Sequence, residues 1–182
     1  MGAQFFHDIV DEYAFSVSLP FGLAGKAREW EKDRMAETDE RLLASLLITP
    51  ETPVGFEFQP LKKKAAIQLM GSRVWGRFNP NHWDPEYAQS TGLSDPIQTG
   101  EMSSAYIAEM CVNHFGAAMF KGARIVCKYI ASTVAGEVIT THGVITEKTP
   151  KGNGFRFKAD IWSENEAGEK KTVGWVEADV GV

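Results

Sequence analysis

The C-terminal third of the chain repeats one pattern that restricts the choice of fold. Four segments alternate apolar and polar residues, as strands with one buried face do. They are residues 124–133, 137–148, 155–163 and 172–179. The turns between them contain Gly136, Gly152-Asn153-Gly154 and Gly168. Turns this short join neighbouring strands in opposite directions, so we predict an antiparallel sheet.

A strongly apolar stretch, residues 102–119, precedes these strands. Its composition predicts a helix that is enclosed on most sides. Ser103 and Ser104 lie at its start, where hydroxyl groups cap free N–H groups. One long helix followed by antiparallel strands predicts an α+β fold, in which the helix lies on a curved sheet.

The first part of the chain has a different composition. We predict a helical extension over residues 1–54 and one main domain over residues 55–182. Within the extension, residues 26–47 contain no Gly or Pro and favour a helix. That helix is expected to pack on the domain or on a neighbouring subunit; a lid over a channel is the alternative. A short helix over residues 65–70 is expected to lead into the loop described next.

Two neighbouring segments point to chemistry. Residues 76–84 read GRFNPNHWD and residues 95–102 read DPIQTGEM. The first places His82 in a proline-containing loop, and the second opens onto the apolar helix. An imidazole titrates near neutral pH, and the free N–H groups of a first helical turn stabilise a developing oxyanion. Together they suggest proton transfer next to a carbonyl group.

These two segments resemble the signature of the MaoC-like dehydratases, also called R-specific enoyl-CoA hydratases, of the hot-dog superfamily. The resemblance runs from about residue 56 to the C-terminus. The matching residues are Gly76, Asn79, Pro80, His82, Asp84, Pro96, Ile97, Gly100 and Met102. The chain departs from the signature at three positions: Arg77 replaces the catalytic Asp, Thr99 replaces a His, and Glu101 stands between Gly100 and Met102. The resemblance implies a hot-dog fold, with a long central helix on a curved antiparallel sheet.

The resemblance also implies a set of site residues. His82 would be catalytic, with Arg77 and Glu109 as further candidates. The substrate would be bound by Asn79, Thr99, Gly100, Glu101 and Met102. Asp84, Pro80 and Pro96 would support the site structurally.

Each catalytic candidate has an alternative. His82 alone would be a surface or hydrogen-bonded structural residue. Arg77 cannot act as a base, because it stays protonated; it would bind an anionic substrate group or point to solvent. Glu109 either replaces the missing carboxylate or is a solvent-edge residue where the helix emerges. Cys111 and His114 share a helix face, but two residues do not make a metal site, so we expect no metal.

The leading hypothesis is an acyl-thioester hydratase or dehydratase of the enoyl-CoA type, acting without a cofactor on an acyl-CoA or acyl-carrier thioester. A non-catalytic hot-dog subunit that binds an acyl thioester or supports a partner subunit is one alternative, and a thioesterase is another. Fold alone does not choose among them. We expect a homodimer or a larger even-numbered assembly, because pairing with a second copy covers exposed strand edges.

Composition limits the other possibilities. The net charge of −5 argues against a general nucleic-acid binder. Lys62-Lys63-Lys64 is too short to change this, and we interpret it as a solvated loop or a helix start. Two cysteines make no disulfide framework and fit a reducing compartment. No apolar run approaches membrane-spanning length, so a cytoplasmic protein is expected.

Overall fold

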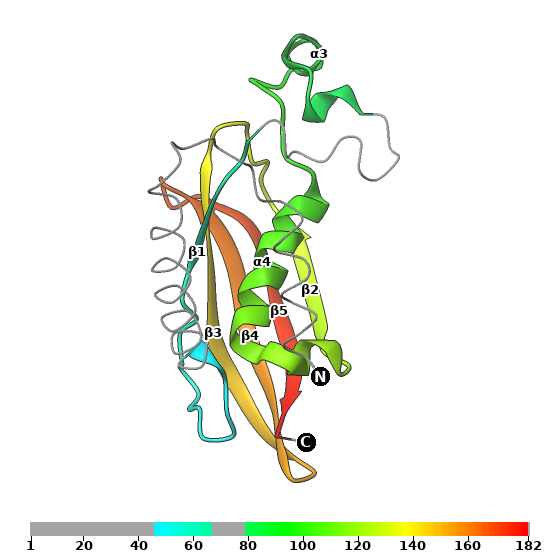
Figure 1. Cartoon of the computed structure of the whole chain (residues 1–182). Helices are drawn as coiled ribbons and strands as arrows, with labels where there is room; N and C mark the ends of the chain where they lie inside the picture. The colour runs from blue at the N-terminus through cyan, green and yellow to red at the C-terminus, as the bar shows by residue number, and fades with distance from the viewer. Residues whose placement is uncertain (1–45, 67–78, 182) are drawn as a thin grey trace, which may run out of the picture. The chain divides into compact units, whose positions relative to one another are not determined.

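The computed structural model describes residues 46–66 and 79–181 (Figure 1). The described residues belong to one compact unit, Leu43–Val182. The predicted helix over residues 26–47 lies almost entirely outside the described residues, as do Gly76, Arg77 and most of the predicted 65–70 helix. The predicted domain boundary after residue 54 stays a prediction.

Five antiparallel strands form one sheet in the order β1-β3-β4-β5-β2. The strands are β1 (Leu61–Lys64), β2 (Arg124–Tyr129), β3 (Val138–Lys151), β4 (Gly154–Asn165) and β5 (Lys170–Val180). β3, β4 and β5 are joined by short turns in which Gly152 and Gly168 have positive φ. A residue with a Cβ is strained in that conformation, which explains glycine at both turns.

The long helix α4 (Gly100–Phe115) lies across this sheet (Figure 1). Its buried residues recur every three to four positions and so form one face: Ser103, Tyr106, Ile107, Met110, Cys111, His114 and Phe115. The facing strands contribute their alternate residues, including Ile145, Phe157 and Val176. Fully burying one such side chain contributes about 1.5–3 kcal/mol. The α+β hot-dog fold expected from the sequence is confirmed.

The ends of the predicted elements differ in informative ways. The predicted 102–119 helix is α4 followed by a 3₁₀ turn, η4 (Gly116–Phe120), because the chain turns at Gly116 with φ +53°. The predicted strand 124–133 ends earlier, at Tyr129. Beyond that point the backbone leaves β5, and Val134 makes an isolated bridge with Ile97.

The interpretation of the three lysines as a loop or helix start is wrong. Leu61–Lys64 is the edge strand β1, paired with Val138–Thr141 of β3. Lys62 and Lys64 are exposed, whereas Lys63 is less so. Three identical side chains give no apolar–polar alternation, so this strand is specified by the backbone it pairs with and not by its own pattern.

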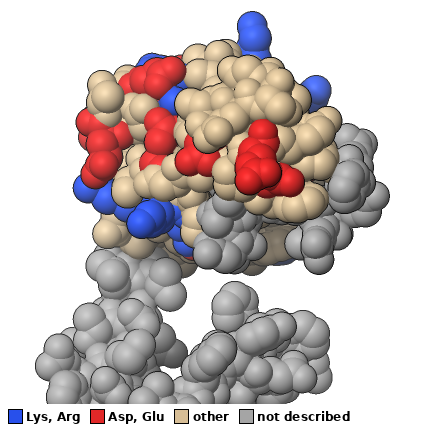
Figure 2. All heavy atoms as spheres, turned by 90° about the horizontal axis from the view of Figure 1, so that it is seen from above, with Lys and Arg blue, Asp and Glu red and all other residues tan. Residues whose placement is uncertain are grey.

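The surface agrees with the acidic composition. Acidic side chains occur at several places over the described part of the face shown in Figure 2, and basic side chains form a smaller group at its lower left. In the described part of the chain, no helix is long and apolar enough to cross a membrane. Those residues also contain no group of three or more His, Cys, Asp or Glu placed to hold a metal ion.

Candidate active site

Two consecutive caps shape the loop that carries His82. Asn79 caps the 3₁₀ helix η3 (Pro80–His82), its Oδ1 accepting from Asn81 N at 3.2 Å. Asp84 caps helix α3 (Pro85–Ser90), its Oδ1 accepting from Glu86 N at 3.0 Å and from Tyr87 N at 3.1 Å. Asp and Asn are favoured caps, and proline suits a first helical position. This local chemistry explains why the predicted structural residues Pro80 and Asp84 surround His82.

Both ring nitrogens of His82 are engaged. Nδ1 lies 2.7 Å from the carbonyl oxygen of Ile97, and Nε2 lies 3.2 Å from Asn79 Nδ2. Because a carbonyl oxygen only accepts, Nδ1 carries the proton and donates it to Ile97. Because Asn79 Oδ1 already accepts from Asn81 N, the Asn79 amide presents its N–H to Nε2. The arrangement selects the neutral imidazole with a lone pair on Nε2, which is the form that accepts a proton.

The same contacts join the loop to the start of α4. Ile97 N donates to Asn81 O at 3.0 Å, and Ile97 stands three residues before Gly100, the first residue of α4. Thr99 caps the helix by accepting from Met102 N at 3.4 Å. Among the described residues, the Gly100 and Glu101 N–H groups have no acceptor. A helix N-terminus carries partial positive charge, so these groups suit an anionic oxygen.

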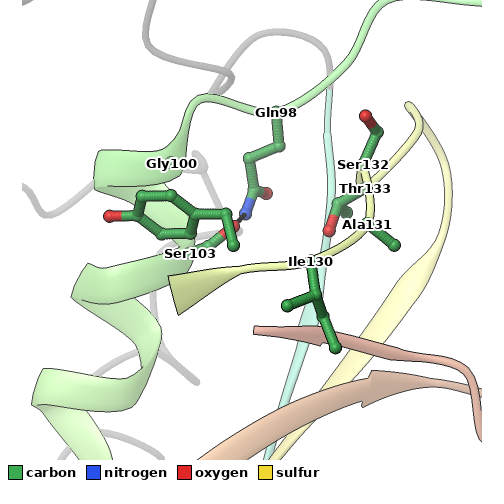
Figure 3. Close-up of a pocket in the computed structure, with 8 residues that line it drawn as sticks. Gln98, Gly100, Ser103, Ile130, Ala131, Ser132 and Thr133 are labelled. Carbon is green, nitrogen blue, oxygen red and sulfur yellow. Dashed lines mark hydrogen bonds between the residues drawn. The ribbon is translucent and has the colours of Figure 1, made fainter. Parts of the chain in front are cut away.

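A pocket of about 320 Å³ adjoins this helix end (Figure 3). Its lining residues are Gln98, Gly100, Ser103, Tyr129, Ile130, Ala131, Ser132 and Thr133. A Cβ on Gly100 would lie 2.7 Å from the Tyr129 ring, so glycine is required for the ring to approach the helix. The Tyr129 hydroxyl is hydrogen-bonded to Ser104 Oγ. The predicted binding residue Gly100 therefore forms part of the pocket wall.

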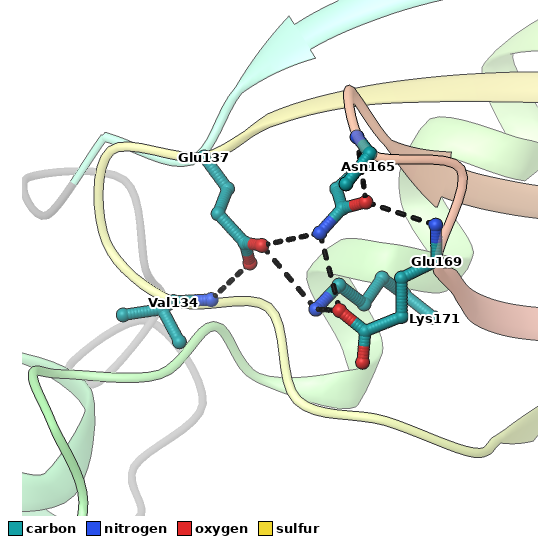
Figure 4. A network of polar contacts seen from close by, with 6 residues as sticks. Val134, Glu137, Asn165, Glu169 and Lys171 are labelled. Atoms are coloured by element: carbon teal, nitrogen blue, oxygen red, sulfur yellow. Dashed lines mark hydrogen bonds and ion pairs between the residues drawn. The ribbon is translucent and has the colours of Figure 1, made fainter.

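A network of polar side chains holds the opposite wall in place (Figure 4). Glu137 Oε2 accepts from Val134 N at 2.7 Å, and its Oε1 accepts from Asn165 Nδ2 at 2.8 Å. Lys171, whose side chain is 5% exposed, lies 3.3 Å from Glu137 Oε1 and 2.6 Å from Glu169 Oε2. Burial raises the pKa of Glu137, but these donors outweigh it and the net pKa is lowered.

We call this network the Glu137 clamp; its members are Val134, Glu137, Asn165, Glu169 and Lys171. The clamp is connected to His82 through the backbone of residues 96–98. Thr133 O accepts from Gln98 N at 2.7 Å, and Ala135 N donates to Pro96 O at 2.8 Å. The segment fixed by the clamp thus sets the path of residues 96–98. The Ile97 carbonyl that orients His82 lies within that path.

Glu109 lies in a different environment. Its carboxylate is 2.7 Å from Lys63 Nζ on β1, and its side chain is 47% exposed. It does not line the pocket. The geometry matches the solvent-edge alternative, and its catalytic role stays a prediction. The structure thus brings His82 and Asn79 together, next to the backbone that precedes α4. Glu109 lies apart from them, paired with Lys63 of β1.

Sequence reasoning missed several residues of this region. Gln98 stands between two signature positions and was treated as a spacer. Tyr129 and Thr133 lie within the predicted strand 124–133, where nothing in the local pattern distinguishes them. Glu137 begins the next predicted strand, so its carboxylate looked like an ordinary exposed residue. Only the folded arrangement shows that these residues meet.

Comparison with known proteins agrees with this architecture. The MaoC like domain family matches residues 58–163, more than half of the chain. No curated protein matches the chain significantly in sequence.

Similar solved structures include the unliganded R-hydratase PhaJ1 from Pseudomonas aeruginosa, with 23% identity and a TM-score of 0.62 over 71% of this chain and 83% of that one. The (R)-hydratase from A. caviae involved in PHA biosynthesis has 16% identity and a TM-score of 0.60 over 71% and 98%. The ChsH1-ChsH2 complex from Mycobacterium tuberculosis also has 16% identity and a TM-score of 0.60 over 71% and 98%. With its hot-dog fold and the family match over residues 58–163, this chain belongs to the MaoC-like domain family.

Proposed function

We propose that the protein is an acyl-thioester hydratase or dehydratase of the enoyl-CoA type, adding or removing water next to a thioester carbonyl. The observation that carries this proposal is the orientation of His82. Its Nδ1–H is bound to Ile97 O, in the segment that leads into α4, which leaves the Nε2 lone pair as the proton acceptor of the ring. The resemblance to proteins named as R-hydratases supports the same reaction class.

In the proposed hydration, the thioester oxygen accepts from the free N–H groups of Gly100 and Glu101. His82 Nε2 takes a proton from water as the water oxygen bonds to C3 of the enoyl group. The electron pair of the C2–C3 double bond moves toward the carbonyl, and the helix N-terminus stabilises the enolate oxygen. The imidazolium then returns its proton to C2, so water is added and His82 is restored. Water and the thioester are the only reactants, and we propose no cofactor.

Asn79 has a defined part in this cycle. Its Nδ2 donates to Nε2 while the imidazole is neutral. Once Nε2 carries a proton, Nε2 no longer accepts a hydrogen bond. The bond from Asn79 Nδ2 to Nε2 must then break. Asn79 therefore holds the ring with its Nε2 lone pair in place before and after each turnover.

Arg77, which lies outside the described residues, stands where the family has a catalytic Asp. We propose that it binds an anionic group of the substrate, since its planar fork suits a carboxylate or a phosphate. Arg77→Ala should then raise KM for substrates with an extra carboxylate and leave kcat little changed, because it removes binding shared by ground and transition states. Equal KM values for neutral and carboxylate-bearing substrates would contradict this role.

The test of the reaction is a panel of enoyl- and acyl-CoA thioesters in which hydration and free thiol are followed separately. Loss of the enoyl absorbance without thiol release indicates hydratase activity. His82→Ala should reduce turnover by about 10²-fold or more, the scale of a lost general acid or base. His142→Ala is a matched control, because His142 lies on β3 and stacks on Trp162 with ring centroids 5.1 Å apart. Full turnover in a folded His82→Ala variant would refute the mechanism.

One alternative is supported by a specific observation. Arg77 replaces the family's catalytic carboxylate, and one similar structure is a complex of two named components, ChsH1 and ChsH2. A non-catalytic subunit would bind thioesters in the panel but neither hydrate them nor release thiol. Thiol release without hydration would indicate the thioesterase alternative.

We also propose a homodimer, or a larger even-numbered assembly, that forms through β2. Within the described residues β2 pairs only with β5, so its other edge is open. Tyr129 and Ile130 at its end are 51% and 49% exposed. Ile130→Lys should reduce the mass measured by light scattering, whereas Val54→Lys at a site 55% exposed should not. A wild-type monomer at micromolar concentration would contradict the proposal.

A further inference from the structure

Gln98 has a buried acceptor that no described residue uses. Its side chain points between Ser103 and the segment Ile130–Thr133 (Figure 3). The residue is 7% exposed, its backbone N–H donates to Thr133 O at 2.7 Å, and its Nε2 donates to Ser103 Oγ at 3.0 Å. Gln98 Oε1 is buried and has no hydrogen-bond partner among the described residues. Burying a carbonyl oxygen without a donor costs free energy, so this position calls for an explanation outside the fold.

The surroundings of this oxygen hold it in position. The Ser103 contact fixes the amide from the α4 side, and the Thr133 contact fixes the backbone from the other wall. The Glu137 clamp supports that wall through Val134 N. An acceptor whose support comes from several elements is preorganised, so little ordering is needed when a donor binds it.

The pocket beside Gln98 is small, and half of its lining residues carry an amide or an aliphatic hydroxyl, whereas Tyr129, Ile130 and Ala131 add apolar surface. Besides the amide it presents the hydroxyl-bearing residues Ser103, Ser132 and Thr133, in a volume of about 320 Å³. Gly100, whose N–H is proposed to bind the thioester oxygen, belongs to the same wall. An alkyl chain placed here would bury polar groups without partners. A ligand with its own hydrogen-bond donor would satisfy them.

We propose that this pocket selects a short thioester ligand that carries a neutral O–H or N–H donor close to the thioester, and that Gln98 Oε1 accepts its hydrogen bond. The placement of the thioester at the start of α4 rests on the proposed function. Gln98 would then be the residue that determines which thioester is bound. Two parts of a CoA thioester supply such a donor: a hydroxyl on the acyl group and the amide of the pantetheine arm. Both present the same chemistry to Gln98.

The test measures binding without turnover, by calorimetry with saturated CoA thioesters. Two pairs differ only by a hydroxyl in place of a methyl group: glycolyl-CoA with propionyl-CoA, and 4-hydroxybutyryl-CoA with valeryl-CoA. Octanoyl-CoA tests chain length. In the wild type, the hydroxylated member of at least one pair should bind about tenfold tighter, the scale of one hydrogen bond to a preorganised buried acceptor. Octanoyl-CoA should bind no tighter than valeryl-CoA.

Gln98→Met keeps the length of the side chain and removes the acceptor. It should abolish the preference for the hydroxyl group, whereas Gln89→Met, the same change at an exposed position on α3, should preserve it. Ser103→Ala, which releases the Gln98 amide, should reduce the preference and serves as a second variant if Gln98→Met does not fold.

The outcomes separate the two sources of the donor. If Gln98→Met weakens both members of each pair by about the same factor, the donor is the pantetheine amide and the acceptor role of Gln98 stands. Unchanged affinities in a folded Gln98→Met variant, or tightest binding of octanoyl-CoA to the wild type, would overturn the proposal. Because no turnover is measured, absence of hydratase activity does not affect this test. Equal affinity for all five thioesters, unchanged by Gln98→Met, would defeat the inference while leaving the hydratase proposal intact.

Discussion

His114 offers a sharp test of how the core is built, because it is an ionisable residue at its centre. It is 1% exposed and stacks on Phe58 with ring centroids 4.5 Å apart. Its Nδ1 donates to Met110 O at 2.8 Å, and its Nε2 accepts from Gln59 N at 2.8 Å. The Gln59 contact requires the neutral imidazole, because a protonated Nε2 would face the Gln59 N–H with a second donor, whereas Nδ1–H donates to Met110 O in either form.

The expected cost of His114→Leu follows from these contacts. Met110 O keeps its helical partner, so that loss is minor. Gln59 N–H is left without its acceptor, which costs about 0.5–1.5 kcal/mol because Gln59 is an exposed residue. Loss of the aromatic stack costs about 0.5–1.5 kcal/mol, offset in part by the apolar leucine. We therefore expect the free energy of unfolding at pH 7.5 to fall by about 1–2 kcal/mol.

The same residue predicts a pH dependence with a definite sign. Burial lowers the pKa of His114, and the hydrogen bond to Met110 only partly opposes it. The unfolded chain therefore takes up the proton at a higher pH than the folded chain does. The stability contributed by neutral His114 is complete above the unfolded pKa of about 6.5 and is lost as the pH falls toward the folded pKa. The loss is at most about 1.4 kcal/mol per pH unit.

Urea unfolding of wild type and His114→Leu between pH 8 and pH 5 measures both effects. The difference between the two proteins should be largest at pH 7.5–8 and should shrink below about pH 6.5. His142→Leu is the control: His142 is partly exposed on the outer side of β3, and its replacement should cost less at pH 7.5. A difference between wild type and His114→Leu that stays constant or grows toward pH 5 would refute the account of a buried neutral histidine.

Three further predictions follow from contacts described above or from the packing of the strands. Glu137→Gln should lower the free energy of unfolding by about 1–2 kcal/mol, less than the cost of isolating a buried charge because Glu169 still pairs with Lys171; an unchanged denaturation midpoint would contradict the clamp. Gly174→Ala should prevent β2 from pairing normally, because its Cβ would collide with Val126 O, and a wild-type melting curve would argue against the register. Burial raises the pKa of the Cys111 thiol to about 12, so alkylation at pH 8 should reach Cys111 only after unfolding; rapid labelling of the native protein at that residue would be inconsistent with its burial.

The long elements were predictable because their patterns are redundant. In β3, β4 and β5, many alternating positions each indicate a strand with one buried face. Each turn between these strands has a glycine where positive φ is needed. The helix was predictable for a similar reason, since its apolar residues recur over four turns. Errors are confined to places where the signal is short. β1 has four residues, three of them lysine, and its strand conformation depends on pairing with β3.

The residues of the site also fall into two groups, those that the local sequence predicts and those that it does not. His82 and the cap Asp84 follow from local chemistry, and the structure shows the hydrogen bonds that the residue types suggest. Gln98 and Glu137 do not, because their roles come from partners distant in sequence. Gln98 meets Thr133, and Glu137 meets Lys171, only after the sheet has formed. A single sequence contains no pattern that links such positions.

The two edges of the sheet are chemically unequal, which bears on how far an assembly grows. A sheet with two equivalent open edges adds copies on both sides and extends into a fibre. Here the β1 edge is short and carries the exposed charges of Lys62 and Lys64, which repel a second such edge and disfavour an apolar one. Of the two sheet edges that the described residues form, the β2 edge is the one suited to pairing. In the proposed dimer, association through β2 would use this edge in both copies, so the continuous sheet would end at two chains, with the lysine-bearing β1 strands at its outer edges.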